Sequence, residues 1–232
     1  QPESARYGSR CPICFDDWDV NAAQRVQICC CRSVCRSCGE KIVDKPCPLC
    51  RAPDFKSNAE RLAALRRHVN NDMPEAVKHL GGAYEHGDQA LGIVKSAKKA
   101  VKLYERAVEL GDVGAMVNLG LHYNGMRTGA GVKVDKKKAM QLFRMAADRG
   151  SPQGQSNLAL VLMEENETEQ AVHWFRVAAQ RGLAAAQVNL AVCYANGITV
   201  DRDLDEAKRL CALAAAAGNQ EARAMLAKLN AS

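Results

Sequence analysis

The chain has 232 residues, a formal net charge of +6, and a composition that is 47% hydrophobic but only 5% aromatic. An alanine-rich, aromatic-poor chain of this length favours close-packed helices over a β-sandwich. No stretch approaches the roughly 20 apolar residues that span a bilayer, so we expect no membrane-spanning segment and no membrane partner. The first residues, Gln-Pro-Glu-Ser, show no charged-then-apolar leader, so no secretory signal is predicted there.

The cysteines are concentrated near the start of the chain, where nine of the eleven lie between Cys11 and Cys50. They form three C-x-x-C pairs and one central group, namely Cys11/Cys14, Cys35/Cys38, Cys47/Cys50 and Cys29-Cys30-Cys31. A C-x-x-C turn presents two thiolates to one tetrahedral zinc ion, with Zn–S distances of about 2.3 Å. This pattern favours zinc over a disulfide scaffold, which needs an oxidising compartment. It also favours zinc over a thioredoxin-like redox motif, which needs a βαβ pattern.

Residues 11–53 read CPICFDDWDVNAAQRVQICCCRSVCRSCGEKIVDKPCPLCRAP and resemble a RING domain of the rarer all-cysteine type. The resemblance implies a small zinc-stabilised α+β cross-brace over residues 1–56, with two structural Zn²⁺ ions. The implied ligands are Cys11, Cys14, Cys35 and Cys38 for one ion, and Cys29, Cys31, Cys47 and Cys50 for the other. Cys30 is then the spare thiol, although the sequence leaves open which of the three central cysteines is not a ligand.

The RING resemblance also implies a partner and the residues that contact it. Ile13 and Pro48 would form an apolar platform for a ubiquitin-conjugating enzyme carrying ubiquitin, and Arg51 would bridge the enzyme and ubiquitin. The alternative for Arg51 is an ordinary surface charge. The chain departs from the family pattern because no histidine precedes His68 and because Gly39–Pro46 leaves barely two turns for the family's central helix.

Residues 57–71, SNAERLAALRRHVNN, predict a helix that joins the cysteine-rich module to the rest of the chain. Ser57 and Glu60 have the spacing of a capping box. Leu62, Leu65 and Val69 mark one apolar face of the predicted helix. We therefore expect the helix to dock against the next segment and not to act as a loose linker.

Residues 72–232 contain an internal repeat with two signatures. The first is an alanine followed four residues later by leucine, at Ala76/Leu80, Ala115/Leu119, Ala186/Leu190 and Ala222/Leu226, with Gly154/Leu158 as a variant. The second is A-x3-[YFC]-x2-A-x3-G, beginning at Ala100, Ala139, Ala171 and Ala207. This periodicity predicts an all-α solenoid of stacked helix pairs.

The spacing between the signatures shows which turn is rigid. The second-signature alanine precedes the next leucine by 19 residues in every repeat, whereas the leucine precedes the next alanine by 20, 20, 13 or 17 residues. All length variation therefore falls in one loop of each repeat. Ser96, Asp135 and Asp203 are predicted N-caps, and the glycine that ends each second signature is a predicted C-terminal glycine.

The fragments HLGGAY, NLGLHYNG and NLAVCYANG, followed by KKAVKLYERAVELGD, resemble Sel1-like repeats, which are related to tetratricopeptide repeats. The resemblance implies four helix pairs and a partial fifth, forming a curved scaffold whose concave face receives a partner protein. Asn118, Asn157 and Asn189 each precede a repeat leucine. Two interpretations are open for them: binding a partner's backbone, or forming an asparagine ladder that satisfies neighbouring helix ends, which is favoured.

Together the two resemblances predict a RING-type ubiquitin ligase that selects a substrate protein through its repeats. The competing hypothesis is a non-enzymatic zinc-binding adaptor for complex assembly. Eight zinc-bound thiolates and two zinc ions would lower the net charge to about +2, so nucleic-acid binding is not favoured. Cys193 and Cys211 are predicted to be buried, small apolar residues. Reduced thiols and the absence of a leader predict a cytoplasmic or nuclear location.

Overall fold

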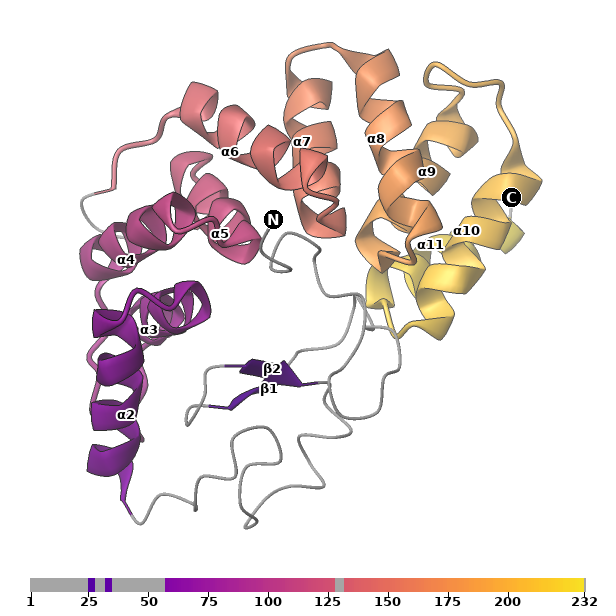
Figure 1. Ribbon diagram of the computed structural model, residues 1–232. Coiled ribbons are helices and arrows are strands. Elements are labelled where there is room, and N and C mark those ends of the chain that lie inside the picture. Colours follow the sequence, from indigo (N-terminus) through magenta and orange to yellow (C-terminus); the bar gives the residue numbers. More distant parts are fainter. Residues whose placement is uncertain (1–24, 28–31, 35–56, 128–131, 232) are drawn as a thin grey trace. The chain divides into compact units, whose positions relative to one another are not determined.

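The computed structural model describes residues 25–27, 32–34, 57–127 and 132–231 (Figure 1). Two short strands, β1 (Arg25–Gln27) and β2 (Arg32–Val34), pair in an antiparallel register that sets Arg25 opposite Val34. The residues that connect them, 28–31, contain the central cysteine group of the sequence.

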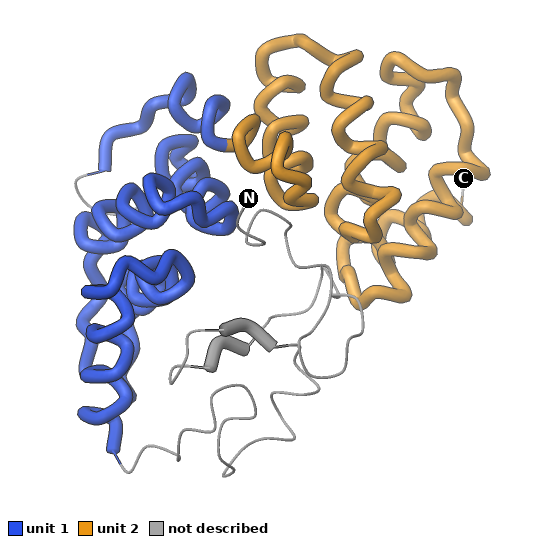
Figure 2. Tube along the Cα trace, in the orientation of Figure 1, with its two compact units in different colours: residues 1–142 blue, residues 143–232 orange. Residues whose placement is uncertain are grey.

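The described part of the chain forms ten α-helices, and most helices that follow one another in the sequence pack against each other. They are α2 (Asn58–Asn70), α3 (Pro74–His86), α4 (Ala97–Glu109), α5 (Val113–Tyr123), α6 (Lys136–Asp148), α7 (Pro152–Glu164), α8 (Thr168–Gln180), α9 (Ala184–Asn196), α10 (Leu204–Ala216) and α11 (Gln220–Ala231). The chain divides into two compact units between Leu142 and Phe143 (Figure 2). The helix pairs α3/α4, α5/α6, α7/α8 and α9/α10, followed by α11, confirm the predicted all-helical repeat.

Small side chains at the signature positions make the core. The second-signature residues are almost fully buried in each copy, as Ala100, Tyr104, Ala107, Ala139, Phe143, Ala146, Ala171, Phe175, Ala178, Ala207, Cys211 and Ala214 show. Gly154 replaces the repeat alanine for a steric reason: a Cβ there would lie 2.6 Å from the Ala146 Cβ. Helices α6 and α7 therefore approach too closely at this point for any larger residue.

The rigid turn combines a helix C-terminus with the N-cap of the next helix. After α6, the Gly150 N–H donates to the Ala147 carbonyl at 2.8 Å and the Ser151 N–H donates to the Ala146 carbonyl at 3.0 Å. These two bonds form a Schellman motif, with Gly150 at a positive φ of 79°. Ser151 then accepts a hydrogen bond from the Gly154 N–H at 3.1 Å. Gly150 and Ser151 both take part in these bonds, so the 19-residue spacing from the second-signature alanine to the next leucine is fixed.

The same turn recurs after α4, α8 and α10, with Gly111, Gly182 and Gly218 at positive φ. Asp112 and Asn219 cap the following helices, whereas Leu183 makes no side-chain cap bond. These caps were not predicted. The predicted caps Ser96, Asp135 and Asp203, on the variable-loop side, are confirmed by bonds from the N–H groups of Lys99, Lys138 and Glu206.

The shortest variable loop, between α7 and α8, also forms a Schellman motif. Between α7 and α8, Asn166 adopts a φ of 62°, and the Glu167 N–H donates to the Leu162 carbonyl at 2.9 Å. Asparagine tolerates this left-handed conformation better than most residues other than glycine. The third repeat therefore has a tight turn at both ends, which explains its 13-residue spacing.

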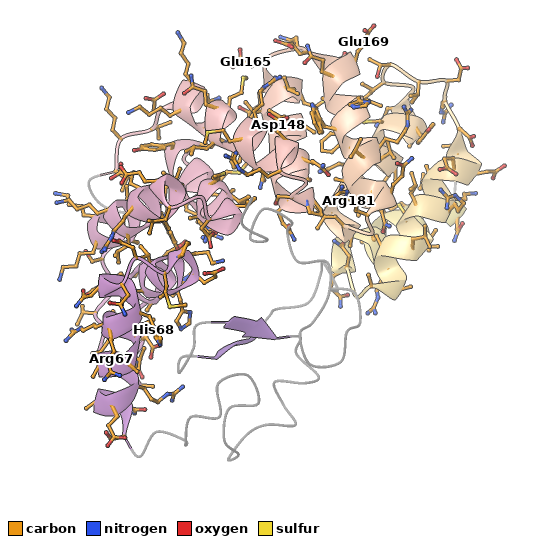
Figure 3. The ribbon with its side chains drawn as sticks, viewed as in Figure 1. Arg67, His68, Asp148, Glu165, Glu169 and Arg181 are labelled. Carbon is orange, nitrogen blue, oxygen red and sulfur yellow. The ribbon has the colours of Figure 1, made fainter. Side chains whose placement is uncertain are left out.

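The joining helix α2 begins as predicted, because the Ser57 hydroxyl accepts a hydrogen bond from the Glu60 N–H at 3.2 Å. Leu65 and Val69 are buried and α2 packs against α3. Arg106 of α4 donates to the Val69 carbonyl at 3.0 Å and to the Asp72 carboxylate. Helix α2 is thus held by both helices of the first repeat. Arg67 and His68 lie in the last turn of α2 (Figure 3).

Successive rigid turns are also linked within the second unit. Arg181, at the C-terminal end of α8, donates to the Gly150 carbonyl at 2.5 Å (Figure 3). None of the described helices has the length and apolar character needed to cross a membrane.

The rigid turn predicts that insertions are tolerated at only one end of a repeat. One glycine inserted between Gly150 and Ser151 should lower stability by at least about 2 kcal/mol, because two turn bonds and a cap lose their register. One glycine inserted between Val200 and Asp201, in a variable loop, should cost less than about 1 kcal/mol. Urea unfolding followed by circular dichroism measures both. Equal destabilisation by the two insertions would contradict the assignment of the rigid turn.

Candidate functional site

The residues predicted to bind zinc and the conjugating enzyme lie outside the described part of the chain. They are Cys11, Cys14, Cys29, Cys31, Cys35, Cys38, Cys47 and Cys50, together with Ile13, Pro48 and Arg51. Their assignment stays a prediction. Among the residues that the structure does describe, no group of three or more His, Cys, Asp or Glu side chains is placed to hold a metal ion.

The three repeat asparagines lie half-exposed at equivalent positions of α5, α7 and α9. Each precedes a buried leucine, but Asn118, Asn157 and Asn189 form no side-chain hydrogen bond with another described residue. The asparagine ladder is therefore wrong for the described residues. Their amide groups are partly accessible to solvent, which leaves the partner-binding interpretation.

A buried glutamine two residues earlier performs the role that the ladder was expected to have. Gln155 Nε2 donates to the Ala147 carbonyl, at the end of the preceding helix, at 3.4 Å. Gln187 repeats this contact with the Ala179 carbonyl at 3.3 Å. The signal was present in the sequence as Q-x-N-L in both repeats, at residues 155–158 and 187–190. The contact with the preceding helix end therefore belongs to the glutamine of this motif and not to the asparagine.

A buried charged cluster in the first unit was not predicted. Glu85, at the end of α3, is 7% exposed. The Tyr104 hydroxyl of α4 donates to its Oε2 atom at 2.6 Å, and Arg127 Nη1 donates to both carboxylate oxygens at 2.7 and 2.8 Å. His122 of α5 is also buried, with its Nε2 atom 3.8 Å from Glu85 Oε2, too far for a hydrogen bond.

The cluster keeps Glu85 ionised. Burial opposes ionisation, but the neighbouring His122, the hydrogen bond from Tyr104 and the charge of Arg127 outweigh it and lower the pKa of Glu85 to about 2. Burial and the bond to Glu85 raise the pKa of Tyr104 well above its ordinary value, so the phenol remains a donor. Since both carboxylate oxygens accept hydrogen bonds, the arrangement is suited to holding structure and not to proton transfer.

The cluster ties a variable loop to the preceding repeat. Arg127 lies in the glycine-rich segment GMRTGAGVK, residues 125–133, between α5 and α6. Its guanidinium is engaged with Glu85, 42 residues away in the sequence. A sequence signal for Glu85 exists, because it continues the buried stripe of Val77 and Gly81 at four-residue spacing. Nothing in the sequence pairs it with Arg127.

Cys193 and Cys211 are 2% and 0% exposed, which confirms that they are buried core residues. Burial raises the pKa of both thiols. Neither is therefore a reactive thiolate.

Acidic side chains gather at one end of the second unit without forming a site. Glu165 and Glu169 lie at the α7–α8 turn, at the opposite end of α8 from Arg181 (Figure 3). Both are exposed, so solvent can screen their charges.

Comparison with protein-family models gives four consecutive matches to the Sel1 repeat, at residues 74–112, 113–151, 153–183 and 184–219. No RING or zinc-finger family matches the chain. A search of curated proteins found no match. The four matched segments begin at or next to the first residues of α3, α5, α7 and α9, as the periodicity predicts.

Solved structures give the same result for the fold. A protective antigen of uropathogenic Escherichia coli, described as having an SLR fold, is 26% identical with a TM-score of 0.68 over 75% of this chain and 37% of its own. A Sel1 repeat protein of Oxalobacter formigenes is 27% identical, with a TM-score of 0.65 over 74% of this chain and 67% of its own. An immunity protein of Pseudomonas aeruginosa, 20% identical with a TM-score of 0.50 over 75% of this chain and 64% of its own, shares the fold alone.

The chain therefore spans little more than a third of the length of the Escherichia coli antigen. Its similarity to that protein concerns the repeats.

The depressed pKa of Glu85 predicts an acid-dependent loss of stability. A carboxyl whose folded-state pKa lies below its unfolded value stabilises the fold above the unfolded pKa, and this contribution disappears as the pH falls from about 4.5 to about 2. The shift corresponds to about 3 kcal/mol. Glu85→Gln should lower stability by about this amount at pH 7 and should progressively lose its difference from the wild type below pH 4.5.

Chemical unfolding at a series of pH values measures the difference, with Glu75→Gln, an exposed carboxyl of the same helix, as the control. A Glu85→Gln penalty that does not change between pH 7 and pH 2 would show that the carboxylate charge does not stabilise the fold.

Proposed function

Because the chain belongs to the Sel1 repeat family, we propose that its repeats hold a protein partner while its cysteine-rich N-terminal segment acts as a RING-type ubiquitin ligase module. Solenoid repeats present extended surfaces to other proteins and have no reactive centre of their own. The ligase activity would therefore reside in residues 1–56, and the choice of substrate in residues 72–232.

The observation that carries the partner-binding role is the set of unpaired asparagines. A carboxamide can donate to a backbone carbonyl and accept from a backbone N–H. Asn118, Asn157 and Asn189 stand half-exposed at equivalent positions, with no bond to another described residue. Within the second unit, Asn157 and Asn189 occupy equivalent positions in successive repeats, which suits an extended segment that offers its own donors and acceptors at regular intervals.

The donor set of the N-terminal segment fits structural zinc. Eight thiolates, in three C-x-x-C pairs and the central group, fill two tetrahedral sites completely, so bound zinc would stabilise the fold and supply no reactive water. The proposed ligands are Cys11, Cys14, Cys35 and Cys38 for one ion, and Cys29, Cys31, Cys47 and Cys50 for the other. The antiparallel pairing of β1 and β2 supports this assignment, because the four residues that connect the strands contain the central cysteines.

The proposed ligase forms no covalent intermediate with ubiquitin. Ile13 and Pro48 would hold the conjugating enzyme by apolar contact, and Arg51 would donate hydrogen bonds to the enzyme and to ubiquitin. Fixing the thioester in a reactive orientation lowers the barrier by several kcal/mol, through proximity alone. The attacking lysine belongs to the substrate that the repeats hold.

The second candidate function is a zinc-binding adaptor without ligase activity. The short Gly39–Pro46 segment favours it, because barely two turns are available for the central helix that completes the enzyme groove in the RING family. The adaptor would use the same zinc ions and the same repeat surface. It differs from the ligase only in failing to activate a conjugating enzyme.

The ligase proposal predicts ubiquitin-chain formation by the zinc-loaded full-length chain with at least one enzyme from a panel of conjugating enzymes. Arg51→Ala should slow chain formation at least about tenfold, equivalent to about 1.4 kcal/mol of lost orientation. Arg6→Ala, the same change outside the cysteine-rich span, is the control. Absence of chains with every enzyme, while both zinc ions are bound, would contradict the ligase and favour the adaptor.

The asparagine proposal predicts that peptides selected from a random phage-displayed library by the wild-type chain bind less tightly to Asn157→Ala/Asn189→Ala. Two lost hydrogen bonds of about 0.5–1.5 kcal/mol each give a roughly tenfold weaker affinity. Gln180→Ala/Asn230→Ala removes two exposed amides elsewhere in the same unit and should have no effect. Isothermal titration calorimetry measures the affinities. Equal affinity of the asparagine variant and the control variant for the peptides would contradict the proposal.

A further inference from the structure

The net positive charge of residues 57–232 lies in the first unit. Residues 57–142 contain 14 Lys and Arg against 9 Asp and Glu, whereas residues 143–232 contain 9 against 10. Much of the excess lies where α4 and α6 begin. We name this group the lysine surface: Lys98, Lys99 and Lys102 of α4, with Lys133, Lys137 and Lys138 before and within the first turn of α6. All six side chains are exposed.

Tyr123 of α5 contacts both α4 and α6. On α4, Lys98, Lys102 and Glu105 share a stripe at four- and three-residue spacing. The Tyr123 hydroxyl donates to Glu105 Oε1 at 2.8 Å, and burial together with this bond raises the pKa of Tyr123 to about 12. The Lys138 Nζ atom lies 5.4 Å from the centroid of the same Tyr123 ring. Lys99 repeats this arrangement over Tyr84, at 5.1 Å.

The helix dipole does not favour these lysines, although Lys138 Nζ lies 3.9 Å from the Asp135 carboxylate. The N-terminal end of a helix carries a partial positive charge, so ammonium groups there oppose the helix dipole. Neither α4 nor α6 has an acidic residue in its first turn. The equivalent helix α10 has Asp205 and Glu206 at this position, as the dipole favours. The same fold therefore accepts acids here, and the first two repeats carry lysines instead.

Exposed apolar side chains stand beside the lysines. Val94 is 82% exposed and precedes the Ser96 cap of α4 by two residues. Val134 is 52% exposed and immediately precedes Asp135, the cap of α6. A positively charged surface with exposed valines offers both charge and apolar contact to a partner.

We propose that the lysine surface binds an acidic protein segment that carries apolar side chains. The inference rests on the proposed role of the repeats as a protein-binding scaffold, and it names the chemistry of the partner. Ammonium groups attract carboxylates, and the exposed Val94 and Val134 would each offer apolar contact to the partner. Two valines provide too little apolar area for insertion into a bilayer. A nucleic-acid backbone would leave both valines without an apolar partner.

The test uses a labelled peptide of alternating glutamate and leucine and the full-length zinc-loaded chain, with fluorescence anisotropy at low salt. Lys98→Glu/Lys102→Glu should weaken binding about tenfold or more, because charge complementarity is reversed. These changes also favour the helix dipole, so the variant is expected to fold. Arg223→Glu/Lys228→Glu makes the same charge change on the exposed side of α11 and is the matched control.

A second pair of measurements tests the contribution of the exposed valines to peptide binding. Val94→Ser/Val134→Ser should weaken the glutamate–leucine peptide about threefold or more, and should leave a glutamate–serine peptide unchanged. Equal loss with the lysine variant and the α11 control would overturn the proposal, as would no binding by the wild type. Tighter binding of a single-stranded oligonucleotide or of phosphatidylserine vesicles than of the peptide would overturn it in favour of those partners.

Failure here is distinguishable from failure of the proposed function. Unanchored ubiquitin chains form on the N-terminal segment, so Lys98→Glu/Lys102→Glu should leave their rate unchanged. If that rate is retained and the acidic peptide does not bind, only the partner chemistry is wrong. If no chains form but the peptide binds as expected, the lysine surface stands and the repeats serve an adaptor.

Discussion

The turn that ends one helix and caps the next is the constraint on which the repeat depends. Two backbone bonds of a Schellman motif and one side-chain cap occupy consecutive residues, as at Gly150 and Ser151. A turn without a spare residue fixes the translation and the angle between two helices. Alanine at the contact positions then permits close packing, down to the point where only Gly154 fits. Variation in length is excluded from this turn and appears in the opposite loop.

Much of the fold was predictable because its determinants are local. Periodic alanine and leucine, glycine at the C-terminal turns, and the caps Ser96, Asp135 and Asp203 all act within a few residues of their own position. The capping residues of the rigid turn, such as Asp112, were equally local but were missed, because the repeat signature ends at the preceding glycine. The ladder hypothesis was wrong because Gln155 and Gln187, not the asparagines, reach the preceding helix end.

The buried cluster could not be predicted from the sequence, since it joins groups that are distant along the chain. Glu85 and Arg127 are 42 residues apart, and their pairing depends on how the loop after α5 folds back over the first repeat. A buried carboxylate is tolerable only when donors surround it, and Tyr104 and Arg127 provide them. The result is a loop held by charge among described residues whose buried side chains are mostly apolar.

The proposed division of labour follows from the different sources of stability in the two regions. Each unit of the repeats buries its own set of apolar side chains. For the cysteine-rich segment we propose that zinc would supply much of the folding free energy, because a segment of about 56 residues can bury little apolar surface. The most direct test of this two-part account is to measure zinc per chain by mass spectrometry, and helical circular dichroism before and after chelation. The account predicts two zinc ions and unchanged helical signal after their removal; no bound zinc, or loss of the helical signal with the metal, would contradict it.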